Sequence, residues 1–163
     1  MGLIGKISGT MAILSVVIAA AGGEASAGTA TTSFTVQTNT IAVCKITTAA
    51  ATMDFGNYDP TATADNDNGL GSFGFKCTKG TAYKVYIAGG RTMAAGSESL
   101  SFEMYSDPGR SIIFPDTNAA GISGSASSNG IEIITNIYGR IPAGQDVTAG
   151  KTFTQTLTAT VDY

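Results

Sequence analysis

Cys44 and Cys77 are the side chains of this sequence best suited to covalent chemistry, and the chain has no other cysteine. A redox-active or nucleophilic cysteine needs a Cys-x-x-Cys spacing or a basic partner such as histidine, and the chain contains no histidine. A structural disulfide needs only an oxidising compartment. We therefore predict a disulfide between Cys44 and Cys77, and no catalytic residue.

A run of acidic and amide side chains, Asp65-Asn66-Asp67-Asn68-Gly69, offers a second kind of chemistry, the binding of calcium. An EF-hand spacing would need an oxygen ligand where Gly69 stands and a glutamate where Lys76 stands. The run is therefore interpreted as a solvated turn, and the sequence predicts no metal site and no cofactor.

The stretch around which we organise the rest of the chain is the last one, Lys151–Tyr163, where apolar side chains alternate with threonines. One side carries Phe153, Leu157, Ala159, Val161 and Tyr163. This alternation predicts a strand with one buried face. An apolar terminal strand needs a neighbour on both sides, because otherwise it remains an open edge that pairs with other chains.

The first 27 residues have the three parts of a secretory signal peptide. Lys6 precedes an apolar run from Met11 to Ala21, and Ala25-Ser26-Ala27 forms a cleavage site. The run is too short to span a bilayer, so we expect no membrane anchor after cleavage. The net charge is −3 without a cluster of Lys or Arg, so nucleic acid is not an expected partner.

The expected mature N-terminus, residues 28–40, has no charge and no proline. One alternating face carries Phe34, Val36, Thr38 and Thr40. Composition alone favours a disordered leader, whereas the alternation favours an arm that becomes a strand when it meets an apolar groove. Both interpretations stay open on the residues alone.

The rest of the chain is rich in Thr, Gly, Ala and Ser and has no long helical period, which predicts an all-β domain. Strands are expected at 41–48, 53–58, 71–77, 82–88, 99–105, 111–114, 131–138 and the C-terminus. The third and fourth are expected to pair as a hairpin through the Lys79-Gly80 turn, and 118–130 to be a loop. Seven or eight short strands favour a β-sandwich.

Several motifs resemble the spore coat protein U domain, the pilin domain of archaic, Csu-type chaperone-usher pili. They are Met53–Tyr58, the Cys77 strand with Gly80 and Tyr83, the Leu100-x-Phe102-x-Met104-Tyr105-x-Asp107 pattern, the run Tyr138–Gln145 and the alternating C-terminus. The resemblance covers nearly all of residues 28–163, and its most specific parts are Tyr138-Gly139-Arg140-Ile141-Pro142 and the paired cysteines.

The resemblance implies an incomplete immunoglobulin-like sandwich that lacks its last strand. Phe153, Leu157, Ala159, Val161 and Tyr163 would line the resulting acceptor groove and contact a periplasmic chaperone. At an outer-membrane usher, the arm of another pilin subunit would replace the chaperone strand, through Phe34, Val36, Thr38 and Thr40. The implied division is 1–27 signal peptide, 28–40 donor arm and 41–163 pilin domain, and the product is a filament on the cell surface.

Other classes of function remain open at this stage. The first interpretation is a structural pilus subunit that serves attachment and biofilm formation. A tip adhesin or carbohydrate-binding module would need an exposed aromatic platform, and the chain has no Trp; a spore coat protein is a further alternative. A hydrolase would need carboxylates held about 5 to 9.5 Å apart, and neither Asp65/Asp67 nor Glu98/Glu103 lies on a pattern that fixes such a distance.

Overall fold

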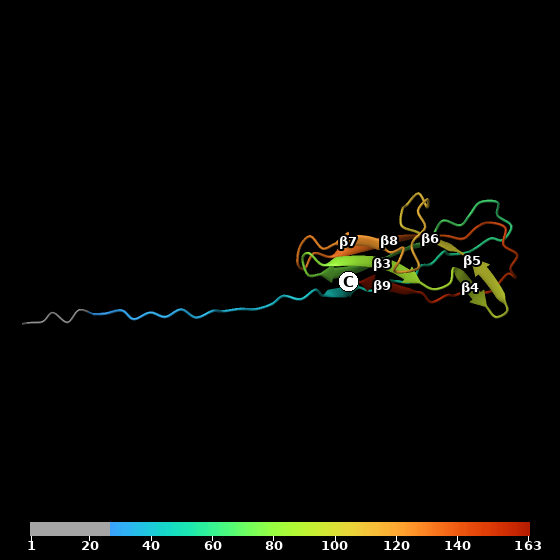
Figure 1. The fold of residues 1–163 in the computed structure, drawn as a ribbon. Helices are drawn as coiled ribbons and strands as arrows, with labels where there is room; N and C mark the ends of the chain where they lie inside the picture. The colour runs from blue at the N-terminus through green and yellow to red at the C-terminus, as the bar shows by residue number, and fades with distance from the viewer. Residues whose placement is uncertain (1–26) are drawn as a thin grey trace, which may run out of the picture. The chain divides into compact units, whose positions relative to one another are not determined.

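The structure is a computed structural model that describes residues 27–163 (Figure 1). The predicted signal peptide therefore lies outside the described residues except for Ala27. The chain divides into two units, one ending at Thr38 and the other spanning Asn39–Tyr163. Residues 27–43 form neither helix nor strand. Among the described residues, no helix has the length and apolar character needed to cross a membrane.

The unit that begins at Asn39 contains strands and no helix in its described residues, so the all-β prediction is confirmed. The strands are β1 (Cys44–Thr48), β2 (Leu70–Cys77), β3 (Ala82–Ala88), β4 (Thr92–Ala95), β5 (Glu98–Ser101), β6 (Glu103–Tyr105), β7 (Ile122–Ser125), β8 (Ile133–Arg140) and β9 (Thr158–Asp162). A four-stranded sheet has the order β1-β2-β8-β6, and a three-stranded sheet has the order β7-β3-β9. All neighbours are antiparallel, and the short β4–β5 hairpin lies at one end (Figure 1).

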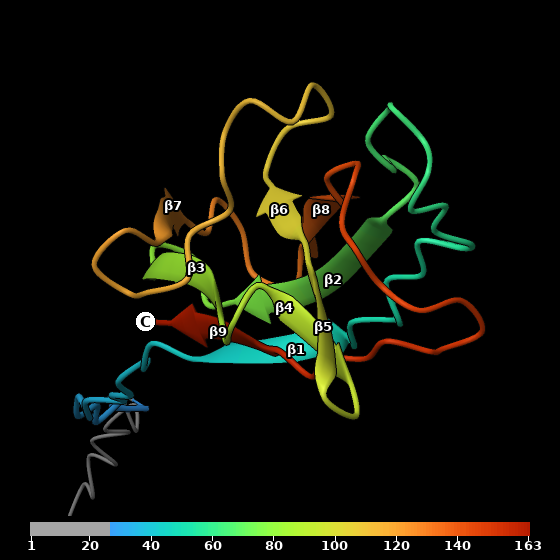
Figure 2. The same ribbon diagram turned by 90° about the vertical axis from the view of Figure 1, so that its right-hand side faces the viewer.

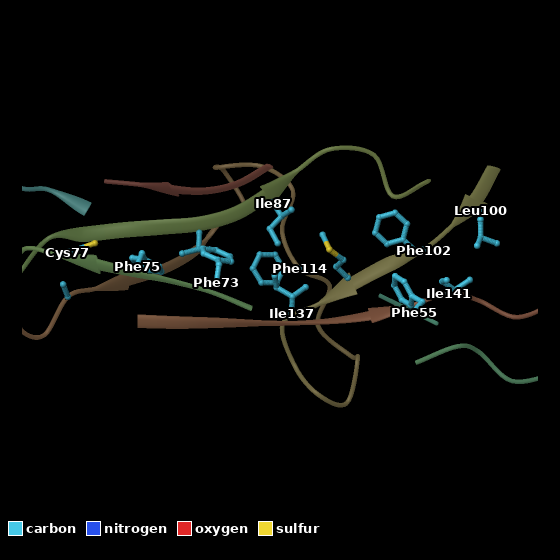
Figure 3. Packing of buried hydrophobic residues seen from close by; sticks show 13 residues of the cluster. Phe55, Phe73, Phe75, Cys77, Ile87, Leu100, Phe102, Phe114, Ile137 and Ile141 are labelled. Atoms are coloured by element: carbon cyan, nitrogen blue, oxygen red, sulfur yellow. The ribbon is translucent and has the colours of Figure 1, made fainter. Parts of the chain in front are cut away.

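The core lies between the two sheets, as the sandwich prediction requires. Figure 3 shows its side chains between strands of opposite sheets, with Phe73 and Phe75 from β2 and Ile87 from β3. Phe73, Phe75 and Phe114 are at most 1% exposed. Full burial of such a side chain is worth about 1.5 to 3 kcal/mol, so these rings contribute much of the stability.

The predicted disulfide is present and joins β1 to β2. Cys44 and Cys77 stand opposite each other in the β1–β2 ladder and are bonded. Cys77 is only 4% exposed and belongs to the core. The bond therefore anchors an outer strand of the four-stranded sheet to the interior of the sandwich.

The predicted hairpin between β2 and β3 is wrong. β2 pairs with β1 and β8, whereas β3 pairs with β7 and β9 in the other sheet. The Lys79-Gly80 turn instead carries the chain from one sheet to the other. The Gly80 N–H donates a hydrogen bond of 2.8 Å to the Ala126 carbonyl. Both strands have one apolar face, and that pattern suits strands packed face to face as well as strands paired edge to edge.

Five other expected segments differ from the structure. Residues 53–58 form no strand although Phe55 is buried, and 111–114 contributes only an isolated bridge. The predicted loop 118–130 contains β7, and the predicted strand 99–105 is divided into β5 and β6. The C-terminal strand is shorter than expected, because continuous pairing begins at Thr158 after an isolated bridge at Thr154.

Replacing Cys44 or Cys77 with Ser is expected to lower the yield of exported protein sharply. The bond closes a loop between positions 33 residues apart, and such a cross-link is worth about 3 to 4 kcal/mol. The direct measurement is a thiol titration of the denatured wild-type protein, which should find no free thiol. Two titratable thiols would contradict the disulfide.

Candidate functional site

One side of the sandwich is open between two outer strands. β1 ends the four-stranded sheet and β9 ends the three-stranded sheet, and Figure 2 shows them side by side. A pocket of about 190 Å³ separates them, lined by Cys44, Lys45, Ile46, Ala159, Thr160 and Val161. No other described strand pairs with the outer side of β1 or β9.

A second cavity, of about 320 Å³, lies farther along the chain toward Leu157 and shares Ala159 with this pocket. Its apolar lining comes from both sheets and from the segment before Phe55: Met53, Phe55, Ile87, Met93, Phe102, Met104, Ile137, Leu157 and Ala159. Ala159 borders this cavity and also the pocket beside β1, so we call the two together the β1–β9 groove. Protein interiors are close-packed, so an apolar gap of this size is room for side chains that the domain itself does not supply.

Four of the five residues proposed for the acceptor face pack against the core, and Tyr163 does not. Phe153, Leu157, Ala159 and Val161 are partly buried against the core, and the last three line the β1–β9 groove. Tyr163 is 58% exposed and borders a separate pocket near Lys84. The core-facing side of β9 is therefore apolar but only half covered.

The backbone of β9 presents hydrogen-bonding groups to the same opening. The Ile87 N–H donates to the Pro115 carbonyl at 2.9 Å, so it does not bond to Ala159, its neighbour across the β3–β9 ladder. In an antiparallel pair, residues that do not bond across the ladder direct their N–H and C=O groups outward. Ala159, and Val161 two residues later, therefore direct these groups away from β3, where a further strand would bind them.

The sequence did not predict the residues that face β9 from the other side of the groove. Ile46, on the same side of β1 as Cys44, is 51% exposed. Two core-facing positions, one in β2 and one in β8, are glycines, Gly71 and Gly139. The side chains of Met53 and Phe55 pack over them. A side chain at Gly139 would stand 2.6 Å from the Phe55 ring and 2.7 Å from the Met53 sulfur. Glycine at a core-facing position of an alternating strand is the sequence signal that would have indicated this packing.

The predicted donor residues lie in the segment that forms no strand. Phe34 and Val36 are each 84% exposed, and Thr38 and Thr40 are exposed as well. The segment thus has two large apolar side chains on one alternating face and a backbone without strand partners.

A polar cluster holds the segment that leads into β9. The Glu98 carboxylate in β5 accepts hydrogen bonds from the Lys151 ammonium at 2.6 Å and from the Thr148 hydroxyl and N–H at 2.6 and 2.8 Å. The bond from Lys151, followed by those from Thr148, lowers the pKa of Glu98 to about 2. Negative charge on Glu98 therefore helps to position the chain just before the groove wall.

The Tyr138–Gln145 run has a structural role in this domain. Arg140 donates to both oxygens of Asp67, at 2.7 and 2.9 Å, and its hydrogen bond lowers the pKa of that carboxyl. Ile141 is 2% exposed and exchanges backbone bonds with Asn66. Asp65 also pairs with Arg140, and the described residues contain no group of three or more His, Cys, Asp or Glu placed to hold a metal ion.

Comparison with known proteins gives three findings. A sequence model of the Spore Coat Protein U domain matches residues 30–160. Protein U of Myxococcus xanthus is 30% identical over 160 residues, which cover 85% of this chain and 88% of that protein. In structure, the chain is similar to one in the CsuC–CsuE chaperone–tip adhesion subunit pre-assembly complex from archaic chaperone-usher Csu pili of Acinetobacter baumannii, with a TM-score of 0.49 and 17% identity. That match covers 76% of this chain and 40% of the solved chain.

Stability should fall more steeply in the wild type than in Glu98→Gln as the pH drops from about 4.5 to about 2. A carboxylate whose pKa is lower in the folded state stabilises the fold above its unfolded pKa, and this stabilisation is lost as the pH falls through the folded pKa. The measurement is the melting temperature as a function of pH. Asp116→Asn is the control, because Asp116 makes no side-chain hydrogen bond or ion pair with the described residues. If the melting temperatures of wild type and Glu98→Gln fall in parallel with pH, Glu98 does not anchor the segment before β9.

Proposed function

The chain belongs to the Spore Coat Protein U domain family, and we propose that it is a structural subunit of a surface fibre assembled by donor-strand exchange. The observation that carries this proposal is the β1–β9 groove, where an apolar cavity and unpaired strand edges occur together. A strand that enters the groove satisfies both features at once.

The donor is the arm, residues 28–40, of a second copy of the chain or of a related subunit. Its Phe34 and Val36 supply the large apolar side chains that the cavity lacks, and its backbone pairs with Ala159 and Val161. The donor arm and the acceptor groove are then formed by different residues of each subunit. Such contacts are heterologous and do not close, so repeated donation produces a filament.

An unfilled groove needs a temporary cover during export, because exposed apolar edges aggregate. We propose that a periplasmic chaperone inserts a strand of its own there. At an outer-membrane usher the arm of the next subunit replaces the chaperone strand. Export through the signal peptide at 1–27 precedes these steps.

Attachment to surfaces and biofilm formation are the roles that we propose for the fibre. The match to Protein U and the description of the family favour a second candidate, a structural protein of a spore coat that uses the same groove. Electron microscopy of cells with and without this chain separates the candidates. Loss of surface fibres supports the pilus subunit, whereas altered spores with intact fibres support the coat protein, and bare fibres that no longer adhere support a tip adhesin.

Leu157→Asp or Val161→Asp is expected to abolish co-purification with the chaperone. Each substitution places a charge against the apolar groove, and the cost of removing that charge from water is several kcal/mol. Thr158→Asp is the matched control and should be milder, since Thr158 is exposed on the opposite face of β9. If all three variants lose the chaperone alike, the orientation assigned to β9 is wrong.

Deletion of residues 29–40 should leave a subunit that folds on its chaperone and cannot donate to its neighbour. Phe34→Asp should mimic the deletion, because burial of this ring is worth about 1.5 to 3 kcal/mol. Thr35→Asp, on the other face of the arm, should assemble better than Phe34→Asp. The measurement is fibre length by electron microscopy.

A synthetic peptide of residues 28–43 should raise the melting temperature of the arm-deleted subunit, because a ligand that binds only the folded state stabilises it by mass action. A peptide with Asp in place of Phe34 is the control and should have little effect. Normal polymerisation of the deleted subunit, or no response to the wild-type peptide, would exclude donation by this arm.

A further inference from the structure

The methionines of residues 28–163 are gathered in one place. These residues contain Met53, Met93 and Met104 and no other methionine, and all three line the 320 Å³ cavity of the β1–β9 groove. Met104 is 3% exposed and lies within the core. Met53 and Met93 are only partly buried and pack against the core from the segment before Phe55 and from β4.

Few other groups in the domain react readily with a peroxide. The two cysteines are joined in the Cys44–Cys77 disulfide, and no free cysteine is present. The sequence has neither Trp nor His. Thioether oxidation follows access to solvent, so a peroxide that meets the subunit reacts first at the two partly buried methionines of the groove, ahead of the buried Met104.

We propose that Met53 and Met93 form an oxidation site that closes the β1–β9 groove to strand donation; this inference rests on the proposed function. In the reaction with hydrogen peroxide, the thioether sulfur attacks one peroxide oxygen and the O–O bond breaks. The sulfur gains that oxygen and loses two electrons, and the other oxygen leaves as water after proton transfer. The product is methionine sulfoxide, and a sulfoxide reductase reverses the change.

The sulfoxide acts on the part of the groove that the donor must fill. Its S=O group is a hydrogen-bond acceptor and is more polar than the thioether, and it would stand beside the apolar side chains of Phe55, Ile87 and Leu157. The donors that line the same cavity are Thr52, Ser72, Gln155 and Thr156, so the oxidised groove is hydrated where the unoxidised one is apolar. An incoming apolar side chain such as Phe34 would displace the water that hydrates this oxygen, which disfavours binding. A groove that already holds a strand shields both sulfurs, so oxidation stops unassembled subunits and spares finished fibres.

The test uses the purified mature chain, treated with hydrogen peroxide either before or after it assembles. Peptide mapping by mass spectrometry should find oxidation at Met53 and Met93 ahead of Met104 in the unassembled protein, and protection of both in preformed fibres. Assembly followed by size-exclusion chromatography should fall by roughly tenfold or more after treatment. A methionine sulfoxide reductase should restore it.

The double variant Met53→Leu/Met93→Leu keeps the volume of the lining and should assemble equally before and after peroxide. Met104→Leu is the matched control and should remain as sensitive as the wild type. If protein that is fully oxidised at both sites assembles like untreated protein, or if the reductase restores nothing, the inference is overturned while the proposed function stands. If the untreated wild-type chain does not assemble, the proposed function fails and the inference fails with it.

Discussion

The structure is organised around a gap between β1 and β9, the outer strands of the two sheets, each of which pairs with a strand on one side only. Each of these strands has one partner, β2 or β3, and their free edges face a common opening that reaches the core. Backbone N–H and C=O groups and apolar side chains both gain from being covered, and a single inserted strand covers both kinds of group. The remaining features of the domain either hold the walls of this opening or fill the rest of the interior.

The walls are held by bonds that do not involve the missing strand. The Cys44–Cys77 disulfide ties β1 to a buried position of β2, and Glu98 fixes the chain just before β9 through Lys151 and Thr148. At the far end of β8, the Arg140–Asp67 pair closes the loop that precedes β2. A binding site whose walls are already in place loses less conformational entropy when its partner arrives, so this arrangement favours tight strand binding.

The floor of the groove is adaptable by comparison. Gly71 and Gly139 leave space on the core-facing side of the sheet, and Met53 and Phe55 occupy it from an irregular segment. Methionine is unbranched and flexible, so it can fit different neighbours without a fixed shape. A lining of this kind can adjust to side chains of different shape without a change in the surrounding strands.

Local sequence was sufficient for the features that depend on neighbouring residues. The alternation of Leu157, Ala159 and Val161 predicted their common face, and the cysteine count in a chain without histidine predicted the disulfide. The local sequence could not assign β2 and β3 to different sheets, because a strand has the same apolar pattern whether its partner lies beside it in one sheet or across the core in another. Ile46 lines the groove only because β1 and β9, more than 100 positions apart in the chain, lie beside each other. The three methionines come from separate segments and line one cavity only in the folded domain. Contacts between such distant segments depend on the packing of the whole chain, so the tertiary structure alone decided where the sandwich stays open.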